Sequence, residues 1–103
     1  MYHYLLLKFE PGFFSDEIFS LAVDTFAEIK SALPGVKDVQ VYRNCSNCSS
    51  NADLLIRMEL AKQEDLELYL EHPLHRSFVE QVNPHVMQKT TFDMAQMINS
   101  VNQ

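Results

Sequence analysis

The sequence predicts an α+β fold, a ferredoxin-like β-α-β-β-α-β unit in which helices cover one face of a four-stranded antiparallel sheet. Three observations lead to this prediction. Four short segments have the apolar patterns of strands, and two longer segments repeat apolar residues at helical spacing. Proline, glycine and asparagine residues separate the segments. Their order along the 103-residue chain is strand, helix, strand, strand, broken helix, strand.

The first strand is expected at Tyr2–Phe9, where an aromatic and aliphatic run ends at Pro11 and Gly12. Side chains alternate between the two faces of a strand. One face then carries His3, Leu5, Leu7 and Phe9, and the other carries Tyr2, Tyr4, Leu6 and Lys8. Because both faces are largely apolar, we expect both to be covered, one by helices and the other by a second subunit.

The first helix is expected to begin after Ser15, a residue type that caps helix N-termini. Asp16 and Glu17 follow in the first turn, where the helix dipole favours acidic side chains. The helix should end before Pro34 and Gly35. Its apolar stripe, which should face the sheet, consists of Ile18, Leu21, Ala22, Phe26, Ile29 and Leu33.

Two strands and a polar loop are expected in the middle of the chain. Val36–Tyr42 alternates as a strand, the run RNCSNCSSN reads as a loop, and Asp53–Leu60 alternates again. One face of the second of these strands carries Leu54, Ile56, Met58 and Leu60. This face should join the core.

A broken helix and a last strand complete the predicted unit. Gln63–Leu70 has helical apolar spacing, and a second short helix should run from Pro73 to about Val82, because proline is tolerated in a first helical turn. Gln88–Met94 supplies the last strand. Residues 1–94 would then form one domain, and residues 95–103 a C-terminal tail. Apolar residues of this end region, which either pack on a partner or fray, are Met94, Met97, Ile98 and Val101.

Composition and charge argue against several classes of function. The formal net charge is −6, and the lysines and arginines are scattered, which argues against binding to nucleic acid or to an anionic membrane. No apolar run approaches bilayer length, and the N-terminus lacks the pattern of a secretory leader. We therefore expect a cytoplasmic protein. The sheet face that the helices leave bare predicts a homodimer formed through sheet faces.

Four stretches of the chain form the most specific pattern: HYLLLKF near the start, LPGVKDVQVYRN in the middle, YLEHPLHRSFVE later, and TTFDM at the end. The order and spacing of these stretches, which cover nearly the whole chain up to Met94, resemble those of the stress-responsive dimeric α/β-barrel (Dabb) domain family. The resemblance implies a ferredoxin-like dimer that forms a shared barrel, with a cavity between each sheet and its helices. Functions within the family diverge. Many members have no assigned activity, plant members are linked to stress tolerance, and one plant member cyclises a linear polyketide by aldol chemistry without a cofactor.

The resemblance to that cyclase implies a catalytic site at Tyr69 and His75, with a pocket histidine at His3 and an aspartate at Asp93. A neutral His75 would take a proton alpha to a carbonyl group, and Asp93 would orient its ring. Tyr69 would donate a hydrogen bond to the developing enolate oxygen. Neither a metal nor another cofactor is implied.

Two pocket positions differ from those of the cyclase: Leu54 stands where the cyclase has a histidine, and Phe26 stands where it has a tyrosine. A smaller or differently polar pocket is therefore expected. A small apolar or carbonyl ligand would contact His3, Leu5, Phe26, Leu54 and Phe78.

Three functions remain open at this point. The first is a homodimer with a small-molecule pocket of unassigned ligand. The second is a cofactor-independent lyase, cyclase or isomerase acting on a carbonyl, polyketide-like compound. The third is a structural, stress-associated scaffold whose cavity is filled by Phe9, Phe26, Phe78 and Phe92.

Several candidate residues also have a purely structural explanation. His75 and Tyr69 could form a hydrogen-bonded pair at a helix junction, and His72, just before a proline, is expected to cap the next helix or bond backbone. Cys45 and Cys48 form a C-x-x-C inside a polar loop. We interpret them as two reduced thiols, because a structural zinc site needs four ligands and no second pair exists; a reversible disulfide or a metal shared across the dimer is the alternative.

Overall fold

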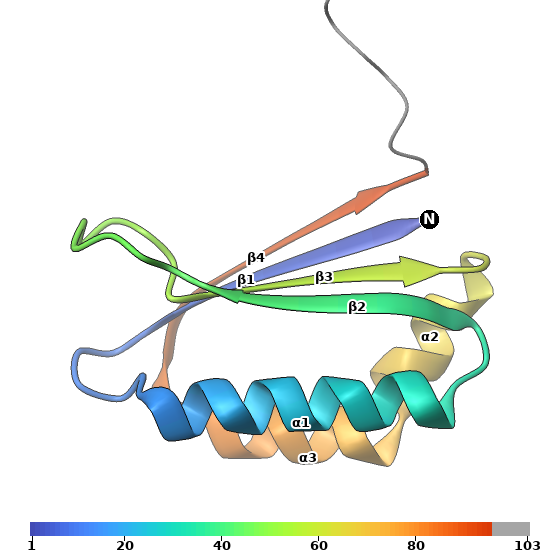
Figure 1. Ribbon diagram of the computed structural model, residues 1–103, viewed down its shortest axis with the longest axis horizontal. Coiled ribbons are helices and arrows are strands. Elements are labelled where there is room, and N and C mark those ends of the chain that lie inside the picture. The colour runs from blue at the N-terminus through green and yellow to red at the C-terminus, as the bar shows by residue number, and fades with distance from the viewer. Residues whose placement is uncertain (96–103) are drawn as a thin grey trace, which may run out of the picture.

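A computed structural model describes residues 1–95 of the chain and shows the predicted order of elements (Figure 1). The elements are β1 (Tyr2–Phe9), α1 (Asp16–Ala32), β2 (Val36–Arg43), β3 (Leu54–Leu60), α2 (Glu64–Glu71), α3 (Pro73–Val82), the 3₁₀ turn η1 (Asn83–His85) and β4 (Val86–Met94). Strand β4 begins two residues earlier than predicted. Of the predicted tail, Met97, Ile98 and Val101 lie outside the described residues.

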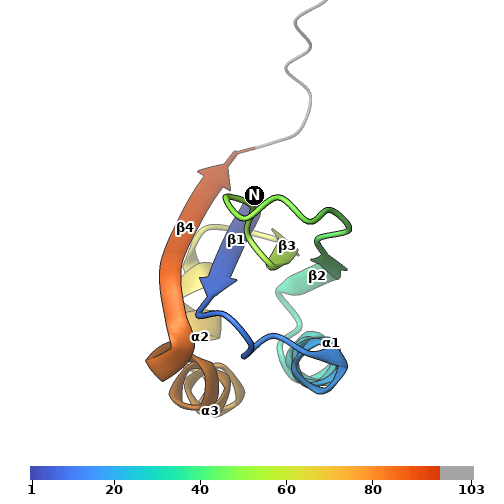
Figure 2. The ribbon, with the colours of Figure 1, turned by 90° about the vertical axis from the view of Figure 1, so that its left-hand side faces the viewer.

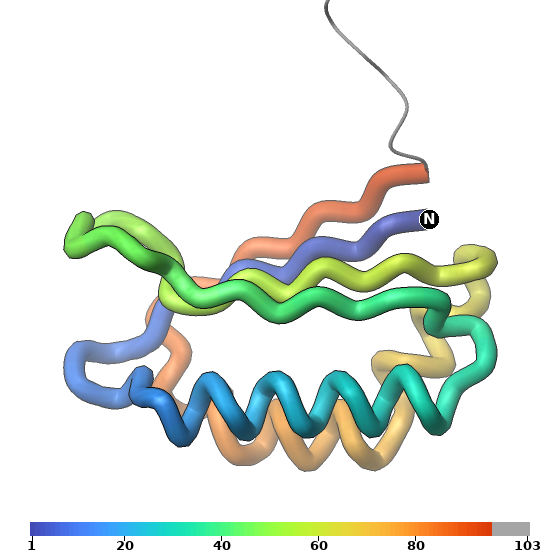
Figure 3. The backbone as a smooth tube through the Cα atoms, viewed as in Figure 1, coloured from blue at the N-terminus to red at the C-terminus, as the bar shows by residue number. Residues whose placement is uncertain are grey.

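The four strands form one antiparallel sheet in the order β2-β3-β1-β4. All three helices lie on the same side of it, with α3 under the β4 side and α1 under the β2 side (Figure 2). The tube view shows the two central strands, β1 and β3, running side by side above the helices (Figure 3). The predicted ferredoxin-like α+β fold is confirmed. Within residues 1–95, no helix is long and apolar enough to cross a membrane.

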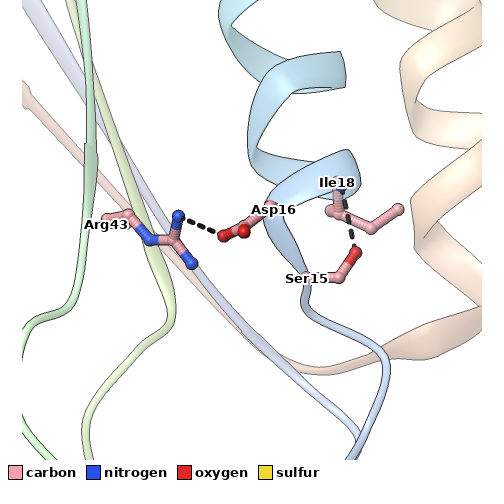
Figure 4. Close-up of polar contacts among 4 residues, drawn as sticks. All are labelled: Ser15, Asp16, Ile18 and Arg43. Atoms are coloured by element: carbon pink, nitrogen blue, oxygen red, sulfur yellow. Dashed lines mark hydrogen bonds and ion pairs between the residues drawn. The ribbon is translucent and has the colours of Figure 1, made fainter.

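The start of α1 is held by the contacts that the sequence predicts and by one from β2. The Ser15 hydroxyl accepts a hydrogen bond of 3.3 Å from the backbone amide of Ile18, as an N-cap should (Figure 4). Arg43, at the end of β2, pairs with Asp16 at 2.8 Å (Figure 4). The same guanidinium lies over the rings of Phe14 and Phe19, and so ties the β2 end to the helix start.

The break between α2 and α3 is built around His72. Its backbone is extended, its ring nitrogen Nδ1 accepts a hydrogen bond of 3.1 Å from the amide of Leu74, and Pro73 follows at the first helical position. The capping role expected for His72 is confirmed. The buried side of α2 carries Asp65 and Tyr69, whereas Leu70 is 43% exposed.

One hydrophobic core lies between the sheet and the helices. β1 and β3 alternate as predicted, and each sends every second side chain into this core. Three of the four phenylalanines expected to fill a cavity are buried there, namely Phe9, Phe26 and Phe78. Phe92 is 59% exposed, so its assignment to the cavity was wrong. The reason is register: Phe92 pairs with Tyr4, whose side chain belongs to the opposite face of the sheet.

The face of the sheet that points away from the helices, called here the outer sheet face, is covered by no secondary structure of residues 1–95 (Figure 1). The cross-strand pairs Tyr4–Phe92, Leu6–Leu55 and Tyr42–Leu55 place its apolar side chains next to one another. Tyr42 is 47% exposed. Two open depressions of about 460 and 180 Å³ lie on this face, and Leu6 lines both.

Candidate functional site

Three of the predicted site residues meet between the sheet and the break in the helices. His3 comes from β1, Tyr69 from the buried side of α2, and His75 from the first turn of α3. The ring centroids of Tyr69 and His75 are 4.6 Å apart, and those of Tyr69 and His3 are 5.9 Å apart. Tyr69 therefore lies between two imidazoles.

Asp93 joins this group through His3. Antiparallel pairing of β1 with β4 sets the two residues opposite each other, and Nδ1–H of His3 donates to the Asp93 carboxylate at 2.5 Å. The side chain of His3 is 7% exposed and that of Asp93 44%. The predicted contact between Asp93 and His75 is wrong, because the strand register assigns the carboxylate to His3.

His75 is oriented by the helix break instead. Its Nδ1 lies 2.9 Å from the carbonyl oxygen of Leu70, and a carbonyl can only accept, so Nδ1 carries the hydrogen. Burial lowers the pKa of His75 below its usual 6.5, and the nearby charges of Lys89 and Arg76 lower it further, while the bond to Leu70 opposes them. A neutral ring with its lone pair on Nε2 follows.

Tyr69 is almost completely buried, with 1% of its surface exposed. Burial alone raises the pKa of its hydroxyl, so that group stays protonated near neutral pH. Within residues 1–95 the hydroxyl has no hydrogen-bond partner. The hydroxyl is not among the fully enclosed, unpaired polar atoms of the described residues, so it keeps a trace of exposure, and its place beside two histidines makes it a candidate ligand contact.

A small cleft opens next to His75 between α3, β1 and β4, and is called here the α3–β4 cleft. Its volume is about 40 Å³. Its polar residues are His75, Asn83 and Lys89. The rest of the lining, called here the apolar wall, consists of Leu5, Leu7, Phe78, Val79, Val82 and Val86.

The residues expected to contact a ligand divide between this cleft and the core. Leu5 and Phe78 line the cleft. Phe26 is fully buried and packs its ring against Tyr69 and Phe78, at centroid distances of 6.0 and 5.4 Å. Leu54 is buried and pairs with Leu7 of β1. Leu7 lies four residues from His3, so Leu54 is about 13 Å along the strand from the level of His3.

Lys89 is a site residue that the sequence interpretation missed. It lies on β4 opposite Leu7, on the same face as Asp93. The sequence could have indicated it, because side chains alternate along β4 and residues 89, 91 and 93 therefore share the helix side of the sheet.

Cys45 and Cys48 lie away from this site, in the loop between β2 and β3. Both thiols are free and exposed. A hydrogen bond from the Ser50 hydroxyl, at 3.1 Å, is the main cause that lowers the pKa of Cys48. No three metal-ligating side chains come together anywhere in the described part of the chain.

Comparisons with known proteins agree with the fold. The sequence model of the stress responsive A/B barrel domain, Dabb, matches residues 1–96. A Dabb family protein of ferredoxin-like fold from Mesorhizobium loti is 26% identical, with a TM-score of 0.69 over 93% of this chain and 95% of that one. A comparison with curated protein sequences finds no significant match.

Two further solved structures share the fold at lower identity. A dimeric ferredoxin-like protein from Thermobifida fusca is 15% identical, with a TM-score of 0.73 over 88% of this chain and 85% of that one. The hydroxynitrile lyase of Passiflora edulis is 8% identical, with a TM-score of 0.71 over 95% of both chains. Because the family match spans almost the whole chain, the protein belongs to the stress responsive A/B barrel domain (Dabb) family.

Proposed function

We propose that the protein is a homodimer that binds a small molecule between its sheet and helices, at the α3–β4 cleft and the adjoining Tyr69. The observation that carries this proposal is Tyr69, a buried side chain whose hydroxyl makes no hydrogen bond within residues 1–95 and whose ring lies 5.9 Å from that of His3 and 4.6 Å from that of His75. Such a group gains most from a ligand that can accept its hydrogen bond. The neighbouring cleft is lined by His75, whose ring contacts that of Tyr69.

Binding can be tested by nuclear magnetic resonance (NMR) with neutral carbonyl compounds of four to six carbons. We expect shift changes at Tyr69, His75 and Phe78, and weaker binding by Tyr69→Phe because a hydrogen bond to the carbonyl oxygen is lost. Tyr42→Phe is the matched control, since it removes a hydroxyl on the outer sheet face. Changes confined to the outer sheet face, or none at all, would contradict the proposal and favour a filled scaffold.

The homodimer is supported by the outer sheet face and by structural neighbours described as dimeric ferredoxin-like proteins. Apolar side chains in cross-strand contact, such as Tyr4 with Phe92, gain most when a second copy covers them. Sedimentation velocity of the wild type should show a dimer, and Phe92→Glu should shift it toward monomer. Leu68→Glu, an equally exposed apolar position on α2, should leave it unchanged. A monomeric wild type would overturn this part.

A second candidate function, cofactor-independent carbonyl chemistry, is favoured by the state of His75. With Nδ1–H bonded to Leu70, the free lone pair on Nε2 can take a proton from the carbon alpha to a carbonyl. The electron pair of the broken C–H bond moves onto the carbonyl oxygen, and the Tyr69 hydroxyl donates to the enolate so formed. Return of the proton to carbon restores the imidazole.

Exchange of alpha hydrogens for deuterium would test this chemistry without knowledge of the natural substrate. The wild type should exchange them in a bound ketone faster than buffer does, and His75→Gln should lose that acceleration because glutamine cannot accept the proton. His85→Gln, which replaces a histidine outside the cleft, is the control. Equal rates for wild type and His75→Gln would remove His75 as the base.

A further inference from the structure

The mouth of the α3–β4 cleft is positively charged in a protein whose net charge is −6. Lys89 lines it from β4, and within residues 1–95 its ammonium group makes no ion pair or hydrogen bond. Arg76, on the first turn of α3, adds a second positive charge near His75. None of the residues that line the cleft is acidic. An anion at this mouth would meet attraction and no repulsion from the lining.

The acidic side chain on the same face of β4 is committed elsewhere. Asp93 lies four residues along the strand from Lys89, about 13 Å at the rise of a strand, and bonds His3. The ammonium group of Lys89 is therefore available to pair with an anionic ligand. Asn83 adds an amide that can donate a hydrogen bond at the same mouth.

Behind this polar mouth, the cleft is apolar and small. The apolar wall contributes six aliphatic and aromatic side chains, and the volume of about 40 Å³ is roughly three times the ~10–15 Å³ that one water requires. Only the end of a ligand, such as a methyl or isopropyl group, fits inside. The remainder would lie at the mouth, beside Lys89 and His75.

We propose that the cleft binds short-chain aliphatic carboxylates, with the alkyl end on the apolar wall and the carboxylate on Lys89 at the mouth. This inference rests on the proposed function, that the cleft is a small-molecule site, and names the class of its ligand. A charge-assisted hydrogen bond from Lys89 supplies the preference for an anion over a neutral molecule of equal shape. The same carboxylate faces His75 and stabilises its protonated form.

The test compares 3-methylbutanoate with its neutral amide, 3-methylbutanamide, by NMR titration of the full chain. We expect the carboxylate to bind about fivefold or more tightly, as an exposed to half-buried ion pair allows. Lys89→Met should remove that preference, because it weakens binding of the carboxylate more than binding of the amide. Lys37→Met, which removes an exposed lysine outside the cleft, should keep it. The carboxylate alone should raise the pKa of His75.

The outcomes separate the two proposals. Equal affinities for acid and amide, or a preference that survives Lys89→Met, would overturn the carboxylate assignment and leave the cleft as a small-molecule site. Failure of both compounds, and of the neutral carbonyl set, to perturb Tyr69, His75 or Phe78 would overturn both. A carboxylate preference lost only in Lys89→Met, together with the pKa change at His75, supports the assignment.

Discussion

Gly35, in the turn between α1 and β2, allows the buried carboxyl of Asp65 to pack directly against the backbone. A β-carbon at this position would lie 2.2 Å from both Cγ and Oδ1 of Asp65, and 2.5 Å from Oδ2. Asp65 is 7% exposed, and its Oδ2 accepts a hydrogen bond of 3.1 Å from the amide of Lys62, just before α2. Gly35→Ala must therefore displace a carboxylate that is buried and bonded.

The expected loss of unfolding free energy is about 1–4 kcal/mol. Losing the cap-like bond to Lys62 costs about 1 kcal/mol, and a poorly satisfied buried carboxylate about 1–3 kcal/mol more. The lower entropy of the unfolded alanine chain returns up to about 1 kcal/mol. Gly12→Ala is the control: its φ of 85° strains an alanine by about 1–2 kcal/mol, but no atom lies within 4 Å of the new β-carbon.

Urea unfolding at one fixed protein concentration measures these losses. The double variant Gly35→Ala with Asp65→Ala should be only slightly less stable than Asp65→Ala alone, because the obstructing carboxyl is gone. Tyr69 follows Asp65 by one helical turn on the buried side of α2, so Gly35→Ala should also shift the Tyr69 ring signals. A loss below about 0.5 kcal/mol, or fully additive effects in the double variant, would refute this reasoning.

Three further predictions concern the site itself. Tyr69→Phe should leave stability unchanged or raise it by up to about 1 kcal/mol in urea unfolding, because the lost hydroxyl has no partner within residues 1–95; a clear loss would reveal a bond. Folding lowers the pKa of His75, so the contribution of the neutral His75 to the free energy of unfolding is fully present above pH 6.5 and falls as the pH drops below that value. The stability of the wild type relative to His75→Gln should therefore decline from pH 7 to 5; a constant difference would contradict the lowered pKa. Phe26→Ala should cost about 3–5 kcal/mol in the same assay, since Phe26 is fully buried against Tyr69 and Phe78; a cost under 1 kcal/mol would show that the site collapses around the gap.

Local chemistry made most of the fold predictable. Ser15 caps α1 and His72 caps α3 through their nearest amides, contacts that depend on only three or four residues of sequence. The alternation of β1 and β3 likewise follows from residues within each strand. Such features are visible before any tertiary contact is known.

The contacts of the site depend on register, which the sequence of a single strand does not carry. His3 meets Asp93 because β1 and β4 align in one particular way, and the same alignment sends Phe92 to the outer sheet face. His75 took a nearer partner, the Leu70 carbonyl that the break between α2 and α3 leaves free. The alternation of side chains along β4 could also have placed Lys89 on the helix side of the sheet. Its role as an anion contact, however, depends on the absence of acidic residues from the cleft lining, which only the structure shows.

The strand order β2-β3-β1-β4 also bears on how the chain emerges from the ribosome. Strand β1 is synthesised first, yet both of its neighbours come from the second half of the chain, and His3 and Asp93 are 90 residues apart. Strand β1 therefore gains its first neighbour only when residues 54–60 have been synthesised, and its second, β4, only when residues 86–94 follow. Until then at least one edge of β1, an aromatic and aliphatic strand, has no partner, so the sheet is completed only after nearly all of the domain has been synthesised.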